Sequence, residues 1–467
     1  MLAHWDQMVV MPPRGASARA HQLATLEGLA HSLAGAPEVG EWIEELGEAE
    51  LSEVDRDLVR IAKRDWERAR RVPSELAAER AEAGAAGQEA WVRAREQDDF
   101  ASFLPALRRN IELARAVGQC VADGACSAYD ALLSDYDYGL STDHLRMLFG
   151  ELGSRLPPIF AGAPQDHSTA LHVPLDVQRQ AVKGLLRRLG VERSSWRVDV
   201  SAHPFTAWMS PQDTRLTTRY EQDGLESLLS ALHEYGHGLY ERQIDAALHR
   251  TSLGEGTSMS MHESQSKLWE NHVARSVPFA ELIAAELADA GCAFTPQRVR
   301  SQLVRLTRSP IRVSADPVTY PLHIVLRFDL ELALIAGELP AEELPAAWRE
   351  GMRRLLGVEV SNDRIGCLQD VHWGAGSFGY FPSYALGCLI AAQLWEALER
   401  DLGSREQDLR RGELTSIQRW LAQHVHVHGR RLDTLALVEQ ATGEPLDVEP
   451  FMRYALALAK DGASPAP

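Results

Sequence analysis

Two histidines and a glutamate stand close together in the run His233-Glu234-Tyr235-Gly236-His237. On a helix, residues four apart lie one turn above each other, so both imidazoles can reach one metal ion. Glu234 then lies beside them, where it can take a proton from a water bound to that ion. This spacing is typical of zinc hydrolases. The alternative is that ordinary polar side chains of a half-buried helix match the pattern by chance.

The residues around this motif predict the helix that it needs. Apolar or small residues recur at helical spacing at Leu225, Leu228, Leu229, Leu232, Gly236 and Leu239. Asp223 is in position to cap the start of the helix, and Glu226, three residues later, can reach back to it. We therefore expect a helix over about 223–240 whose apolar stripe faces a core.

A catalytic zinc site also needs a third protein ligand and an open position. Metzincins carry Gly and His three and six residues after the second histidine, where this sequence has Tyr240 and Gln243, so that class is excluded. The remaining common solution takes a carboxylate from the next helix, and Glu263 is the best candidate. Glu255, between two glycines, is a weaker candidate. Glu270, two turns beyond Glu263, is better placed to support a histidine ligand.

Composition and charge exclude several other classes of protein. The chain has 467 residues, of which 45% are hydrophobic and 24% charged, as in ordinary globular proteins. A net charge of −18 repels phosphate and anionic lipid, so nucleic acid and membrane surfaces are excluded as main partners. Five cysteines without a Cys-x-x-Cys pair argue against a disulfide framework and for a reducing compartment. With no leader-like or membrane-spanning segment in the sequence, we expect a cytoplasmic protein.

Periodicity predicts a mainly α-helical chain with one short β region. The clearest helical segments before the motif are 51–71, 100–117, 142–156 and 175–189. Alternating β-branched and aromatic residues predict a small antiparallel sheet beside the zinc helix, with strands at 196–201, 205–209 and 214–220. Helices are then expected at 258–271, 278–291, 297–308, 321–336, 344–356 and within 386–460, with an irregular segment at 361–385. We expect a single domain, 1–467, with a helical N-terminal part, 1–190, and a zinc- and substrate-binding part, 191–467.

Six blocks of the sequence together resemble the carboxypeptidase Taq family of zinc metallocarboxypeptidases. They are His203-Pro204-Phe205, Asp213-x-Arg215-x-Thr217, His233-Glu234-x-x-His237, His262-Glu263-Ser264, Ile311-Arg312-x-x-Ala315-Asp316-Pro317 and Gly366-x-x-Gln369-Asp370-x-His372-Trp373. The resemblance covers nearly the whole chain. It implies a gluzincin-like helical fold with a deep substrate groove, a zinc ion at its floor, removal of single residues from peptide C-termini, and a homodimer. Family members usually carry about one more helix before a Leu-x-x-Trp-Asp-Gln-like segment, which here begins at residue 2.

Resemblance and chemistry agree on the metal centre. His233, His237 and Glu263 are the expected zinc ligands, with a water in the fourth position and Glu234 as the general base. Two imidazoles and a carboxylate suit zinc, and cobalt or manganese can occupy the same ligands.

Three further residues are expected to act on the substrate. By similarity to gluzincin peptidases, the phenol of Tyr380 is the first choice and that of Tyr384 the second for stabilising the tetrahedral oxyanion; either can instead pack under a loop. A guanidinium recognises a terminal carboxylate through two parallel hydrogen bonds, which favours Arg312 as its binding residue. The alternative for Arg312 is an ion pair with Asp316.

The remaining polar residues of the blocks have supporting roles. His203 and His372 are expected to line the substrate cleft, with a purely structural histidine as the alternative for each. Four residues are expected to hold the sheet and the irregular loop in place: Asp213, Arg215, Gln369 and Asp370.

The sequence thus predicts a zinc-dependent metallocarboxypeptidase that hydrolyses the C-terminal peptide bond of peptides with a free C-terminus, using metal-activated water. An endo-oligopeptidase or dipeptidase with the same zinc chemistry is the alternative enzyme. A peptide-binding scaffold without turnover is the alternative outside catalysis.

Overall fold

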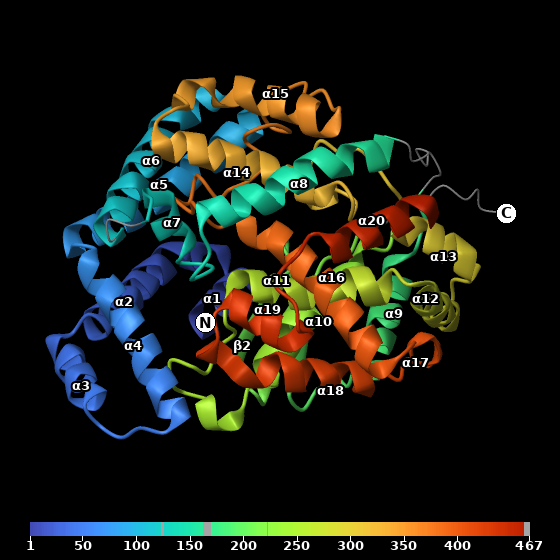
Figure 1. Cartoon of the computed structure of the whole chain (residues 1–467). Helices are drawn as coiled ribbons and strands as arrows, with labels where there is room; N and C mark the ends of the chain where they lie inside the picture. The colour runs from blue at the N-terminus through green and yellow to red at the C-terminus, as the bar shows by residue number, and fades with distance from the viewer. Residues whose placement is uncertain (123–125, 162–169, 222, 462–467) are drawn as a thin grey trace.

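The computed structural model describes residues 1–122, 126–161, 170–221 and 223–461 (Figure 1). It is mainly helical with one small sheet, which confirms the predicted fold class. Among the described residues, we find no helix with the length and apolar character needed to cross a membrane.

The first part of the chain is a series of helices packed side by side. They are α1 (Leu2–Val9), α2 (Ala16–Ala34), α3 (Pro37–Gly47), α4 (Glu53–Arg71), α5 (Ser74–Gln97), α6 (Phe100–Val121), α7 (Ala128–Leu133), α8 (Thr142–Ala161) and α9 (Leu175–Arg188). Side-chain caps fix two of the starts, because Ser52 accepts a hydrogen bond from the Asp55 amide and Asp99 accepts one from the Ser102 amide. The four helices expected from periodicity in this part are all present.

The sheet contains β1 (Trp196–Val200), β2 (Thr206–Ser210) and β3 (Asp213–Thr218), in the order β1-β3-β2. Strands β2 and β3 form the expected antiparallel pair. Strand β1 pairs with β3 in parallel, so the prediction of a wholly antiparallel sheet is wrong for this pair. Alternation along a strand reports which side chains share a face but not the direction of the neighbouring strand. Here β3 lies between the two strands that precede it in sequence.

The second part of the chain returns to helices. They are α10 (Glu226–Arg242), α11 (Met259–Lys267), α12 (Val277–Asp289), α13 (Pro296–Leu303), α14 (Tyr320–Ala336), α15 (Leu344–Leu356), α16 (Pro382–Leu402), α17 (Glu406–Arg411), α18 (Thr415–His424), α19 (Thr434–Thr442) and α20 (Glu449–Asp461). A π-helical segment, Leu268–Ala274, continues directly from α11. Helix α13 ends five residues earlier than expected, at Leu303.

The expected cap of α10 is wrong. Leu225 is the N-cap residue and makes no side-chain cap hydrogen bond, and the helix begins at Glu226. The carboxylate of Asp223 instead lies 3.1 Å from Nδ1 of His172, a distant residue in sequence. A tertiary contact has therefore replaced the local cap that the spacing of Asp223 and Glu226 predicted.

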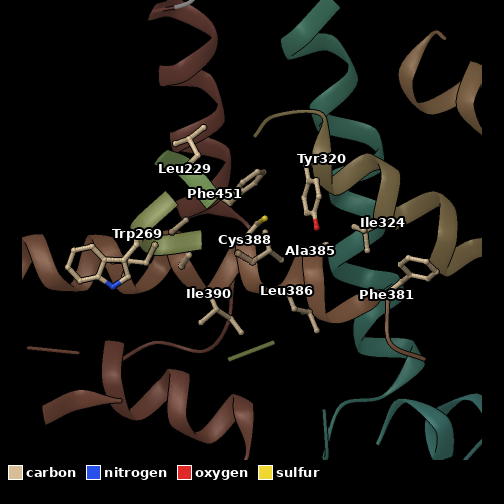
Figure 2. Packing of buried hydrophobic residues seen from close by; sticks show 14 of the residues in the cluster. Leu229, Trp269, Tyr320, Ile324, Phe381, Ala385, Leu386, Cys388, Ile390 and Phe451 are labelled. Atoms are coloured by element: carbon tan, nitrogen blue, oxygen red, sulfur yellow. The ribbon is translucent and has the colours of Figure 1, made fainter. Parts of the chain in front are cut away.

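The interior of the protein is a large buried apolar cluster that runs from Ala94 to Ala459. Figure 2 shows part of it, with side chains of α14, α16 and α20 packed together, among them Tyr320, Leu386 and Phe451. The cluster includes residues from both expected parts of the chain, 1–190 and 191–467, as a single domain requires. The domain limits themselves stay a prediction.

Helix α11 packs closely between α10 and α16 because glycines face it on both sides. A Cβ atom on Gly236 of α10 would lie 2.6 Å from the backbone oxygen of Gln265 and 2.7 Å from Cα of Ser266. A Cβ atom on Gly387 of α16 would lie 2.5 Å from Cγ of Glu263. These distances leave no space for a larger residue, so the two glycines set how near Glu263 comes to α10.

Candidate metal centre

Helices α10 and α11 bring the three predicted ligands together. His233, His237 and Glu263 each offer one donor atom, and these atoms lie within 4.8 Å of one another. Oε2 of Glu263 is 3.7 Å from Nε2 of His233 and 3.8 Å from Nε2 of His237. Glu255, the weaker candidate for the third ligand, is exposed in the loop before α11.

The chemistry of this donor set fits a divalent metal ion. The Nδ1 atom of His233 is 2.9 Å from Oε2 of Glu270, which we assign as an Nδ1–H donating to the carboxylate. Burial opposes a charge on His233, but Glu263 and Glu270 raise its pKa, so a metal ion would take the place of the proton on Nε2. Burial, together with the neighbouring His233 and His262, lowers the pKa of His237 well below its usual range, so that imidazole is neutral, as a ligand must be. Two nitrogens and one carboxylate oxygen match the usual set of a catalytic zinc site.

Glu270 is held by three side chains at once. Its Oε2 atom also lies 2.8 Å from Nζ of Lys267, and its Oε1 atom lies 3.2 Å from Nη2 of Arg275. Burial alone would raise the pKa of Glu270, but Lys267, His233 and Arg275 hold it well below its usual range. Glu270 is therefore a fixed carboxylate behind His233, in the position expected from the sequence.

Glu234 lies beside this group on α10, and its side chain is buried. The hydroxyl of Thr206, on β2, lies 2.7 Å from Oε2 of Glu234 and 2.8 Å from its backbone oxygen. Burial raises the pKa of Glu234 to about 7, against the opposing effect of His233 and the hydrogen bond from Thr206. The strand thus orients the carboxylate that the motif placed next to the two imidazoles.

The predicted alternative for Arg312, an ion pair with Asp316, is wrong. The partner of Arg312 is Asp370, whose Oδ1 atom is 3.0 Å from Nε and 2.9 Å from Nη2 of the guanidinium. The other oxygen of Asp370 accepts a hydrogen bond of 2.7 Å from Nε of Arg327. Asp316 instead accepts backbone hydrogen bonds at the start of α14, from the amides of Val318 and Thr319.

The rest of the Arg312 side chain faces aromatic residues. Its Nη1 atom lies 3.3 Å from the hydroxyl of Tyr320, and its guanidinium carbon lies 4.8 Å from the ring centroid of Tyr384. Gln369 accepts a hydrogen bond of 2.9 Å from the backbone amide of Arg312, which ties the irregular loop to this residue as expected. Arg312 is 7% exposed, so its position is fixed by neighbours on several elements.

Tyr380, Tyr384 and His372 form one aromatic group near Glu263. The rings of Tyr380 and Tyr384 are 5.1 Å apart, and Nε2 of His372 lies 3.3 Å from the hydroxyl of Tyr384. Burial raises the pKa of both phenols, with Glu263 among the charges that act on each, so both stay protonated donors. Burial also lowers the pKa of His372 to about 4, which makes its imidazole neutral.

His203 does not share this environment, since its side chain is exposed and its backbone oxygen accepts a hydrogen bond from Ser201. Asp213 and Arg215 form a two-bond ion pair, at 2.8 and 2.7 Å, on the strand that neighbours β2. This pair supports the sheet, as expected. The guanidinium of Arg215 also lies 4.5 Å from the ring of Trp5, so the pair connects α1 to the sheet.

Sequence reasoning missed three residues that support the site. They are Thr206, which contacts Glu234; Lys267, which contacts Glu263 and Glu270; and Asp137, which accepts hydrogen bonds from Ser260 of α11 and Ser383 of α16. The spacing of Lys267, four residues after Glu263 and three before Glu270, was a usable signal for ion pairs on a helix. Thr206 and Asp137 had no such signal, because their partners are distant in sequence.

Comparison with known proteins gives consistent results. The family described as "Carboxypeptidase Taq (M32) metallopeptidase" matches residues 1–457. Thermostable carboxypeptidase 1 of Thermus thermophilus is 37% identical, over 97% of this chain and 93% of that protein. Carboxypeptidase 1 of Bacillus subtilis is 34% identical over the same shares of the two chains.

Solved structures agree with the sequence matches. A Pyrococcus furiosus carboxypeptidase superimposes with a TM-score of 0.93 at 35% identity, covering 97% of this chain and 94% of that chain. The M32 carboxypeptidase of Deinococcus radiodurans gives a TM-score of 0.92 at 32% identity, covering 98% and 95%.

The geometry predicts that purified protein binds about one divalent ion per chain and that His237→Gln loses it, because two remaining donors hold an ion far more weakly than three. Elemental analysis after dialysis measures the bound metal. His172→Gln, which alters an exposed imidazole paired with Asp223, serves as the matched control and should keep the ion. Equal metal content in the two variants would show that His237 is not a ligand.

Proposed function

This chain belongs to the carboxypeptidase Taq (M32) family of metallopeptidases, and we propose that it is a zinc-dependent carboxypeptidase that shortens peptides from a free C-terminus. The family resemblance predicted from the six sequence blocks is confirmed, and with it the assignment of the chain as a peptide hydrolase. A divalent metal is implied by the family. The choice of zinc, the ligand roles and the chemistry below are our proposal.

The observation that carries this proposal is the convergence of His233, His237 and Glu263, with the buried Glu234 next to the two imidazoles. These three residues would hold the ion. When bound, a divalent ion supplies Lewis-acid activation of water and of the peptide carbonyl. Cobalt and manganese accept the same donor atoms, so metal availability also affects which ion is present.

Glu234 acts as the proton carrier in the proposed reaction. The hydroxyl of Thr206 faces its Oε2 atom, which leaves Oε1 to accept a proton from the attacking water. The same carboxyl group then delivers the proton to the leaving amine. Glu234 lies on helix α10 and its carboxylate contacts Thr206 on strand β2. Because neither element is a loop, the carboxylate needs little reorganisation between the two proton transfers.

Tyr380 and Tyr384 provide hydrogen-bond donors for the negative charge that develops on the scissile carbonyl oxygen. Both phenols are protonated at neutral pH, because a tyrosine ordinarily has a pKa of about 10 and burial raises it further. Donors that are fixed in place before reaction, in a site with little water, stabilise such charge at low reorganisation cost. Tyr380 remains the first choice and Tyr384 the second.

Arg312 recognises the terminal carboxylate of the peptide. Asp370 holds the Nε and Nη2 side of its guanidinium, and Tyr320 and Tyr384 lie around the remainder. An arginine keeps its charge at any physiological pH and has five N–H donors, so it can bind a carboxylate while paired with Asp370. His372, whose Nε2 atom lies 3.3 Å from the hydroxyl of Tyr384, is a further proposed substrate contact, whereas the exposed His203 is proposed only from its sequence block.

Two further parts of the proposal concern the protein as a whole. Homodimer formation rests on the family resemblance, and a cytoplasmic location rests on the cysteine content. The alternative activities, internal cleavage and removal of dipeptides, use the same metal chemistry and differ only in where the peptide end is held.

The direct test of the function is digestion of a decapeptide followed by mass spectrometry. We expect a ladder of products that differ by single C-terminal residues, and no ladder after treatment with a chelator. Internal fragments or losses of two residues would instead identify an endo-oligopeptidase or a dipeptidase.

Glu234→Gln should keep the metal and lower kcat by about 10²–10⁴-fold, because the amide cannot carry the proton. Steady-state kinetics and elemental analysis on the same preparation measure both properties. Glu255→Gln, which neutralises an exposed carboxylate in the loop before α11, is the matched control and should leave kcat unchanged. An unchanged rate in Glu234→Gln would remove this residue from the reaction.

Arg312→Ala should lower kcat/KM by about 10²-fold for peptides with a free C-terminus, since a charged hydrogen-bonding partner of the substrate is lost. C-terminally amidated peptides lack the charge that Arg312 is proposed to bind and should show a much smaller decrease. Comparing the two substrates on one variant corrects for any loss of folded protein. A decrease of the same size for both would assign Arg312 a purely structural role with Asp370.

A further inference from the structure

Lys267 is buried in the metal centre although none of the six sequence blocks contains it. Its side chain is 10% exposed and extends from the last turn of α11. Its ammonium nitrogen lies 2.8 Å from Oε2 of Glu270 and 3.7 Å from Oε1 of Glu263. The ring of Tyr320 lies 4.6 Å from the same nitrogen and covers it from the side of α14.

The two oxygens of Glu263 have different surroundings. Oε2 faces the imidazoles of His233 and His237, at 3.7 and 3.8 Å, whereas Oε1 faces Lys267. A free carboxylate can bind a metal ion through one oxygen or through both. An ammonium ion beside Oε1 competes for that oxygen, so Lys267 favours binding through Oε2 alone.

General helix stability does not explain the position of this charge. A basic residue is stabilising at a helix C-terminus, where backbone carbonyls lack partners. At Lys267, however, the backbone continues in helical conformation into the π-helical segment Leu268–Ala274. Burying an ammonium ion in the interior is strongly unfavourable unless carboxylates compensate for its charge. Its location between two carboxylates of one site therefore indicates a role in that site.

We propose that Lys267 is a positioning residue that keeps Glu263 bound to the metal through a single oxygen and so preserves an open coordination position for water. This inference rests on the metal centre proposed above. The same ammonium ion contacts Glu270, but Arg275 and Nδ1 of His233 hold that carboxylate as well, so the orientation of His233 does not depend on Lys267 alone. A catalytic zinc site differs from a structural one by its open position, which is the property that Lys267 would protect.

Replacing Lys267 by a neutral residue should change metal affinity and activity in opposite directions. Without the ammonium ion, both oxygens of Glu263 are free to bind, and a positive charge that repels the metal is gone. Lys267→Met should therefore bind the ion at least as tightly as the wild type. The gain in affinity should be about tenfold at most, because a nearby positive charge no longer repels the ion. At the same time kcat should fall about 10–100-fold, because the position needed by water is taken.

The test uses protein stripped of its metal and reloaded with Co²⁺, whose visible absorption weakens as its coordination number rises above four. Lys267→Met is compared with Lys267→Arg, which keeps the positive charge, and with Lys267→Gln, which removes it while keeping a polar side chain. The Gln variant provides the comparison if Met at this buried position prevents folding. Chelator competition gives the Co²⁺ affinity of each protein.

We expect the wild type and Lys267→Arg to give the intense spectrum of a four-coordinate ion. The two neutral variants should give weaker bands, with a Co²⁺ affinity that has not decreased. A wild-type spectrum in the neutral variants would overturn the proposal, because Glu263 would then keep its single-oxygen binding without Lys267. If the wild type bound no Co²⁺, the metal centre itself would be refuted, so the two failures are distinguishable.

Discussion

The site depends on how closely helices α10 and α11 approach each other. Gly236 has no side chain at the point where α10 contacts the backbone of α11. Gly387 likewise leaves space for Glu263 where α16 contacts α11. This contact places Oε2 of Glu263 within 4 Å of two imidazole nitrogens on another helix. The proposed metal centre, built on packed helices, has little freedom to move, which suits a reaction that needs its ligands in place beforehand.

Around this contact, buried charges are compensated in local groups. Glu270 is shared by Lys267 and Arg275, and Asp370 is shared by Arg312 and Arg327. Such groups contribute little net stability, since desolvation offsets most of the attraction, but losing one partner leaves a buried charge and is costly. Their effect is to fix geometry: one group orients a proposed metal ligand, His233, and the other orients the proposed carboxylate-binding residue, Arg312.

A third buried carboxylate holds the aromatic segment. Glu331 on α14 accepts hydrogen bonds from the hydroxyl of Tyr129, the indole of Trp373 and the backbone amide of Gly379. Burial raises its pKa to about 7, against these hydrogen bonds. Gly379 immediately precedes Tyr380, so this network anchors the backbone next to that residue. Helix α14 thus contributes to the site without supplying a ligand.

The sequence by itself determined the elements of the protein whose physical basis is local. The spacing of His233 and His237 places them on one helical face wherever that helix lies, and the same periodicity identified Glu270 as the carboxylate that contacts a proposed ligand, His233. Tertiary structure alone decided the partners that come from distant segments. Asp370 rather than Asp316 pairs with Arg312, β1 runs parallel to β3, Asp223 contacts His172 instead of capping α10, and Thr206 reaches Glu234. Each of these outcomes depends on packing between elements, which sequence spacing does not encode, because many partners satisfy a buried charge or hydrogen bond equally well.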